Sequence, residues 1–155
     1  MKKSAGIILY RLKTTKLEVF LVHPGGPFWT NKDIGSWSIP KGEFTDDEDP
    51  LDAAKREIEE ETGIKCSGTF LELTPIKQKS GKLVYAWALE MDVNEDKIQS
   101  NMFEIEWPPK SGQYKSYPEI DKGKWFYFEE AKQKLNPSQS AFIDELKHKL
   151  NNSVT

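Results

Sequence analysis

The sequence contains one cysteine and two histidines in 155 residues. The single cysteine, Cys66, excludes a disulfide within the chain and any zinc site built from several cysteines. Scarce cysteine agrees with a reducing compartment, so we expect a cytoplasmic protein in which Cys66 is a buried thiol. His23 and His148 have no evident nucleophilic partner, and we expect both to have packing or surface roles.

Long apolar runs and an excess of positive charge are also missing. The apolar run behind the two N-terminal lysines covers only residues 5–10, which is too short for a secretion signal or a membrane span. The net charge of −3 argues against a general nucleic-acid binder, which normally presents a basic face. We therefore expect a small-molecule ligand and neither a membrane nor a nucleic-acid partner, with the oligomeric state left open.

Short segments rich in β-branched and aromatic residues alternate with turn residues along the chain. This pattern predicts strands in six segments: 5–11, 17–23, 37–39, 68–78, 83–93 and 125–128. Apolar spacing and capping residues predict three helices: 50–62, 129–135, and a last one that is capped at 136 and runs from 137 to about 150. No repeat or linker interrupts the pattern, so we expect a single α/β domain over residues 1–155.

The predicted helix 50–62 carries four glutamates. At about 100° per residue, Glu57 and Glu61 lie roughly 40° apart, and Glu60 lies roughly 60° to the other side of Glu57. Glu59 points roughly 160° away and should face solvent. Clustered carboxylates repel one another, and a hard divalent cation such as Mg²⁺, with Mn²⁺ as an alternative, would offset this. A solvated acidic face is the other interpretation, so the surrounding residues decide.

A longer pattern surrounds this helix. From Gly42 the chain runs through five residues to Glu48, then seven residues to Arg56-Glu57-Ile58, one residue to Glu60-Glu61, and one residue to Gly63-Ile64. These 23 residues are similar to the Nudix box at every defined position. The resemblance to the Nudix hydrolase family implies an α/β/α sandwich with a mixed β-sheet. It also implies hydrolysis of a diphosphate linkage in a nucleoside derivative.

The same resemblance implies roles for the matched residues. Glu57, Glu60 and Glu61 would bind Mg²⁺, and Glu60 or a neighbour would orient or deprotonate the attacking water. Arg56 would hold a glutamate of the box through a charged hydrogen bond. Glu48 would support the loop or bind the metal through water.

Two residues at the start of the box have their own physical argument. Gly42 carries no side chain, so its backbone carbonyl can approach a metal. Lys41 lies directly before it, where a cation would stabilise charge on a phosphoryl group, although a solvated lysine is an equal alternative. The local Pro-Lys-Gly sequence resembles that of diadenosine polyphosphate hydrolases and of some MutT-like members.

A further acid outside the box often joins the metal site in this family, commonly six residues before the tryptophan of the last strand. Glu119 stands there relative to Trp125, with Glu104 and Glu106 as weaker candidates. Either Glu60 or Glu119 would then act as the general base.

The resemblance leaves the substrate open among nucleotide derivatives, and we expect a nucleoside polyphosphate such as a diadenosine polyphosphate. One alternative is a MutT-like pyrophosphohydrolase of oxidised nucleoside triphosphates, and another is a module that senses a nucleotide without cleaving it. Five aromatic residues outside the predicted strands would stack on a base or pack internally, and we select Tyr117 as the substrate contact: Phe28, Trp29, Trp107, Tyr114 and Tyr117.

Overall fold

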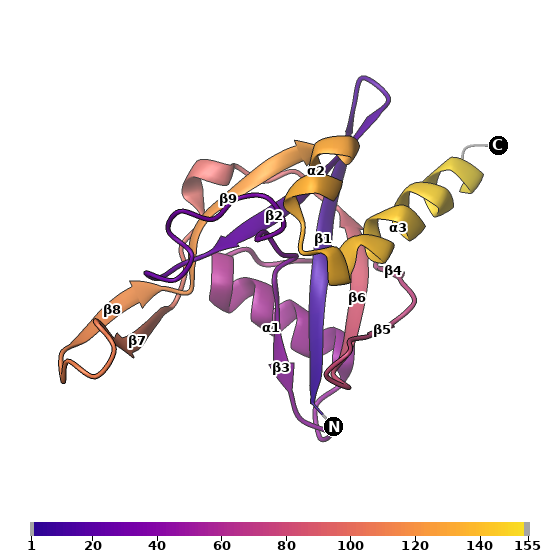
Figure 1. The fold of residues 1–155 in the computed structure, drawn as a ribbon. Coiled ribbons are helices and arrows are strands. Elements are labelled where there is room, and N and C mark those ends of the chain that lie inside the picture. Colours follow the sequence, from indigo (N-terminus) through magenta and orange to yellow (C-terminus); the bar gives the residue numbers. More distant parts are fainter. Residues whose placement is uncertain (1, 154–155) are drawn as a thin grey trace.

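The computed structural model describes residues 2–153. Its centre is a seven-stranded sheet. Its members are β1 (Lys3–Lys13), β2 (Lys16–Pro24), β3 (Lys41–Phe44), β4 (Leu71–Glu72), β5 (Ile76–Lys77), β6 (Leu83–Glu90) and β9 (Ile120–Tyr127). The main order is β4-β6-β1-β2-β9, while β3 pairs with β1 and β5 pairs with β6 (Figure 1). Only β1 and β6 pair in parallel, so the sheet is mixed, as predicted.

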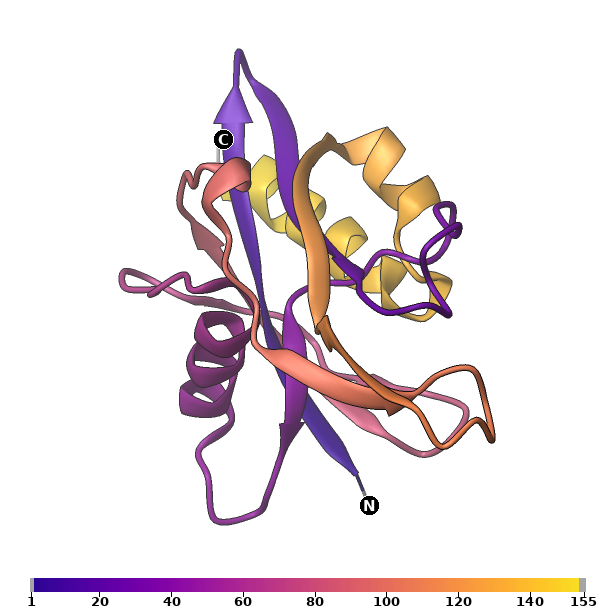
Figure 2. The same ribbon diagram turned by 90° about the vertical axis from the view of Figure 1, so that its left-hand side faces the viewer.

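Helices cover both faces of this sheet (Figures 1 and 2). Alternate side chains of β1 point to opposite faces, so Ile7 packs with α1 (Pro50–Thr62) and Ile8 packs with α3 (Ser140–Ser153). The shorter α2 (Phe128–Lys134) lies on the same face as α3. The three layers confirm the predicted α/β/α sandwich. No helix within residues 2–153 combines the length and apolarity needed to cross a bilayer.

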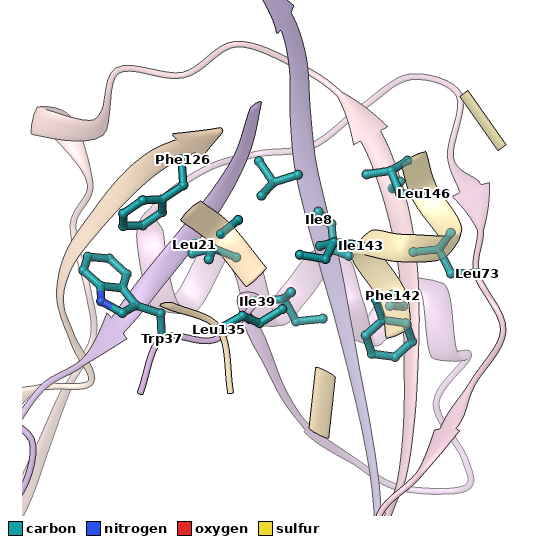
Figure 3. Close-up of a cluster of buried hydrophobic side chains, with 14 of the residues drawn as sticks. Ile8, Leu21, Trp37, Ile39, Leu73, Phe126, Leu135, Phe142, Ile143 and Leu146 are labelled. Carbon is teal, nitrogen blue, oxygen red and sulfur yellow. The ribbon is translucent and has the colours of Figure 1, made fainter. Parts of the chain in front are cut away.

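The core between the sheet and α3 is made of fully buried aliphatic and aromatic side chains. Phe142, Ile143 and Leu146 from α3 lie against Ile8 and Leu21 from the sheet (Figure 3). Burying each such side chain contributes about 1.5–3 kcal/mol to the free energy of folding. This face of the sheet is therefore a packed core.

Capping residues determine where α1 begins and ends. The side chain of Asp49 accepts a hydrogen bond from the backbone N–H of Asp52, and Pro50 occupies the first helical turn. Gly63 ends the helix with a left-handed φ of 79°, and its N–H donates to the carbonyl of Glu59. The predicted bounds and caps of this helix are confirmed.

Several predicted strands have other bounds in the structure. The strand predicted over 83–93 ends at Glu90 as β6, and the strand predicted over 125–128 is the end of the longer β9. The segment 68–78 forms only β4 and β5, because Pro75 between them has no backbone N–H to donate. Residues 37–39 make isolated bridges to Val22 and Leu135, and the strand itself follows as β3. The last helix begins with a 3₁₀ turn, η2 (Pro137–Gln139), and continues as α3.

One hairpin is absent from the sequence prediction. It consists of β7 (Met102–Glu106) and β8 (Tyr114–Pro118), and it projects from the body of the molecule (Figures 1 and 2). The segment 117–121, which lies outside the predicted strands and helices, contains the end of β8 and the start of β9. Residues 103–106 of β7 alternate apolar and polar, but β8 (Tyr-Lys-Ser-Tyr-Pro) does not, and the hairpin lies outside the main sheet.

His23 anchors the long loop between β2 and β3. Its side chain is 1% exposed and packs edge-on against Trp37. The ring Nδ1 lies 2.9 Å from a carboxylate oxygen of Asp121, and Nε2 lies 2.7 Å from the carbonyl oxygen of Lys32. Through these two contacts the ring links its own strand, β2, to β9 and to the loop. The packing role expected of His23 is confirmed.

We predict that His23→Phe lowers the free energy of unfolding by about 2–4 kcal/mol, because a ring of similar size remains while the polar contacts with Asp121 and Lys32 are lost. Urea unfolding measures the change, and limited proteolysis should cut more quickly within residues 25–36. The matched change His148→Phe, at an exposed position of α3, should alter stability by about 0.5 kcal/mol or less. Equal effects of the two substitutions would contradict the anchoring role.

Candidate active site

Three separate elements bring charged residues to one end of the sheet. α1 carries Glu57 and Glu61, β3 begins with Lys41 and Gly42, and Glu119 lies between β8 and β9. Glu119 is near enough for its charge to raise the pKa of Glu61, although it lies far from the box in the sequence. The structure thus places the sequence-predicted acid outside the box beside the helix.

Gly42 makes room for the carboxylate of Glu57. A Cβ added at Gly42 would lie 2.0 Å from Oε2 of Glu57, a distance that no pair of non-bonded atoms tolerates. The side chain of Glu57 is only 12% exposed as a result. Any larger residue at position 42 would displace this carboxylate. The approach of the Gly42 carbonyl to a metal stays a prediction.

Arg56 connects the acid of the loop with those of the helix. Its Nε and Nη2 donate to the two carboxylate oxygens of Glu48 at 2.8 and 2.9 Å. Nη1 donates to Glu57 at 2.9 Å and more weakly to Glu60 at 3.3 Å. These contacts raise the pKa of Arg56 and lower that of Glu48, chiefly through the hydrogen bonds between the two.

The inner carboxylates lack sufficient positive charge. Burial raises the pKa of Glu61 to about 8, and the charges of Glu57 and Glu119 add to this effect. Burial also raises the pKa of Glu57. Lys41 partly offsets the rise at Glu61 but does not cancel it. A further cation at this place would stabilise both carboxylates in their charged form.

Lys82 is a basic residue of this region that the sequence did not predict. Burial lowers the pKa of Lys41, and the nearby charge of Lys82 lowers it further. Lys82 also pairs with Glu43 of β3 at 3.7 Å. It lies just before β6, and only the pairing of β1 with both β3 and β6 brings it near Lys41. No local motif marks that proximity.

Two neighbouring glutamates of α1 are equally exposed but have different partners. The side chains of Glu59 and Glu60 are 49% and 47% exposed. Glu59 lies within 4.0 Å of Lys65, away from the box, whereas Glu60 joins the network of Arg56. The outward direction predicted for Glu59 is confirmed.

The weaker candidate acids belong to the β7–β8 hairpin. The carboxylate of Glu106 accepts hydrogen bonds from the backbone N–H groups of Lys110 and Gly112, so it stabilises the hairpin turn. Glu104 is exposed on β7. Glu119 is among the main charges that raise the pKa of Glu61, and these two are not. The structure favours Glu119 over these two as the additional acid.

The chemistry of the donors suits a hard divalent cation. Within residues 2–153, no three acidic, histidine or cysteine side chains converge closely enough to ligate a metal. The available donors are carboxylate oxygens, which Mg²⁺ prefers, and Lys41 compensates the charge of the half-buried Glu61 only in part. These residues fit Mg²⁺ better than a metal that favours sulfur or imidazole.

Comparison with known proteins places this site in a family. The family described as NUDIX domain matches residues 1–146. The mRNA decapping complex subunit 2 of Schizosaccharomyces pombe is 32% identical over 82 residues, which are 49% of this chain and 11% of that protein. The asymmetrical bis(5′-nucleosyl)-tetraphosphatase of Rattus norvegicus is 30% identical over 101 residues, which are 57% of this chain and 65% of that protein.

A solved structure shows the same fold over the whole length. The binary complex of a C. elegans Ap4A hydrolase superposes with a TM-score of 0.67 at 22% sequence identity. The match covers 98% of this chain and 99% of that chain. The two proteins therefore share the same fold.

We predict that Glu61→Gln stabilises the metal-free protein at high pH. The pKa of Glu61 is raised in the folded state, so its favourable contribution is complete below the unfolded-state value and is lost as the pH rises through about 8. In the presence of a chelator, the variant should gain on the order of 2 kcal/mol over the wild type at about pH 9 and little at about pH 5.

Glu59→Gln is the matched control, because this exposed glutamate should show no comparable pH dependence. Urea unfolding at the two pH values gives the comparison. Added Mg²⁺ should stabilise the wild type more than the Glu61→Gln variant. The explanation would be contradicted if, at high pH and without metal, the wild type were more stable than the Glu61→Gln variant.

Proposed function

The chain belongs to the NUDIX domain family, and we propose that residues 1–155 form one hydrolase domain that cleaves a phosphoanhydride bond of a nucleoside polyphosphate. A diadenosine polyphosphate is the preferred substrate. The observation that carries the proposal is the electrostatic layout of the site. Burial raises the pKa of two half-buried carboxylates, Glu57 and Glu61, in spite of the positive charges of Arg56 and Lys41. Lys41, close to Glu61, and Lys82, close to Lys41, are suited to phosphates.

Members of this family generally use divalent metal ions. We infer that Mg²⁺, with Mn²⁺ as an alternative, is held by four glutamates and one backbone carbonyl: Glu57, Glu60, Glu61, Glu119 and Gly42. When bound, such an ion neutralises the diphosphate and lowers the pKa of a water molecule. The fit of Glu57 against Gly42 and the raised pKa of Glu61 support this assignment.

The general base is Glu60 in this proposal, with Glu119 as the alternative. Glu60 is the most accessible glutamate of the Arg56 network, and its bonds to Arg56 are longer than that of Glu57. A carboxylate that water reaches and that is held loosely can accept a proton from an attacking water molecule. Arg56 orients the helix glutamates, and Glu48 holds Arg56 in place.

Lys41 and Tyr117 are the proposed substrate contacts within this site. Lys41 is half-buried next to the carboxylates, where its charge would meet the phosphates. Tyr117, two residues before Glu119, would contact the organic part of the substrate. The name of the rat relative, an asymmetrical bis(5′-nucleosyl)-tetraphosphatase, supports a dinucleoside polyphosphate as the substrate class.

We predict Mg²⁺-dependent turnover of diadenosine tetraphosphate, with ATP and AMP as products, in a panel with nucleoside triphosphates, nucleotide sugars and inositol pyrophosphates. Chromatography of the products identifies the bond that breaks. Pyrophosphate and a monophosphate released from an oxidised nucleoside triphosphate would favour the MutT-like alternative. Absence of turnover across the panel, with retained nucleotide binding, would favour a sensing module.

We predict that Glu60→Gln lowers kcat by about 10²-fold or more while the fold and the melting temperature are retained, because the amide cannot accept the proton. Glu59→Gln is a closely matched control, since it lies next in the chain and is equally exposed. It should change kcat by less than about twofold. An equal loss in the two variants would overturn the assignment of Glu60.

A further inference from the structure

The base of the β7–β8 hairpin is bonded directly to the proposed catalytic helix. The backbone N–H of Asn101 donates to the carbonyl of Glu60 at 3.1 Å, and that of Glu119 donates to the carbonyl of Asn101 at 2.8 Å. Gly25, in the loop after β2, donates to the carbonyl of Glu119 at 2.9 Å. A continuous series of backbone hydrogen bonds therefore connects α1, the hairpin and this loop. Figure 1 shows the hairpin and the loop at the same end of the molecule.

One face of the hairpin is aromatic. Phe103 and Tyr117 are paired across β7 and β8, and their ring centroids lie 6.3 Å apart. Trp107, whose N–H continues the ladder to Gln113, lies four residues after Phe103 and so faces the same side. Its ring meets that of Phe28, from the loop after β2, edge to face at 5.1 Å. We call these four side chains, Phe28, Phe103, Trp107 and Tyr117, the aromatic platform.

The aromatic platform is held in place yet partly open to solvent. A Cβ added at Gly26 would lie 2.8 Å from the ring of Phe103, so the loop lies directly on the hairpin. Beyond this contact, His23 and an ion pair between Asp33 and Lys134 fix the remainder of the loop. Phe28 nevertheless remains 55% exposed. Solvent-exposed aromatic rings in a fixed arrangement are suited to binding a planar ligand.

The position and length of the aromatic platform match the organic part of the proposed substrate. It begins at Tyr117, two residues from Glu119, and continues outward from Phe103 to Trp107 over about 13 Å of strand. A sugar and a base attached to phosphates at Glu119 would lie along it. Lys115, paired with Ile105, lies on the same face and adds positive charge for a phosphate chain.

We propose that the aromatic platform binds a nucleobase of the substrate by stacking and thereby selects nucleosides over other phosphate esters. This inference rests on the proposed function, since it assigns the base to a surface next to the same site. Stacking of one base on an aromatic side chain changes affinity by about 5- to 150-fold. The effect should be insensitive to which base is present, because every base has a π-face.

The test compares binding of AMP and ribose 5-phosphate, which differ by the base and contain no anhydride bond to hydrolyse. Isothermal titration calorimetry in the presence of Mg²⁺ should show that the wild type binds AMP at least about fivefold more tightly. Trp107→Ala should abolish this preference and leave the affinity for ribose 5-phosphate unchanged. Phe28→Ala, at an exposed position of the loop, should reduce the preference as well.

Tyr114→Ala is the matched control. Tyr114 is an aromatic residue of the same hairpin, but it is paired with Glu106, lies on the opposite face and is 65% exposed. This variant should retain the preference for AMP. Circular dichroism and melting temperature verify that the variants fold.

Two results would overturn the proposal that the aromatic platform binds a nucleobase. One is equal affinity of the wild type for AMP and ribose 5-phosphate, and the other is a preference that survives in Trp107→Ala. Turnover of diadenosine polyphosphates without any base preference would reject the platform and retain the proposed hydrolysis. A preference for AMP that depends on Trp107, without turnover of any anhydride, would retain the platform and reject hydrolysis.

Discussion

The close approach of α1 to β3 is the constraint on which the rest of the site depends. The carboxylate of Glu57 occupies the space in which any side chain of residue 42 would lie, so glycine at that position sets the distance between helix and strand. The same approach buries Glu61 and brings Lys41 beside it. A longer separation between α1 and β3 would expose Glu61 and Lys41 to water and return their pKa values toward the usual ones. The packing of one glycine against one carboxylate thus creates the unusual electrostatics of the region.

Burial affects the two charged groups at the centre of the site in opposite directions. It raises the pKa of Glu61 to about 8 and lowers the pKa of Lys41, so in both cases it disfavours the charged form. The guanidinium of Arg56 donates to Glu48, Glu57 and Glu60, whereas the positive charge beside Glu61 is that of Lys41. The charged form of Glu61 therefore lowers the stability of the folded protein, and a bound divalent cation would remove this cost. Such a loss of stability is typical of residues that serve binding.

Local features of the fold could be predicted from the sequence, whereas non-local ones could not. The caps of α1, its bounds and the outward direction of Glu59 follow from residues within one or two helical turns. A helical projection, however, shows only relative directions, so it could not tell that Glu61 faces the interior while Glu60 remains accessible. Lys82 reaches the site through strand pairing alone, and Glu119 was expected from family resemblance and not from any periodicity. The hairpin was missed because it faces solvent.

Backbone hydrogen bonds connect α1, the hairpin and the loop after β2, so they join the proposed metal-binding glutamates to the aromatic platform. Asn101 uses its N–H for the carbonyl of Glu60 and its own carbonyl for the N–H of Glu119, so one residue positions two acids of the site. The aromatic residues of the hairpin extend from that junction. A displacement of the hairpin would therefore be transmitted through these hydrogen bonds to the backbone of Glu60 and Glu119. In the proposed function, one set of backbone hydrogen bonds would thus couple the contact with the organic group to the alignment of the carboxylates.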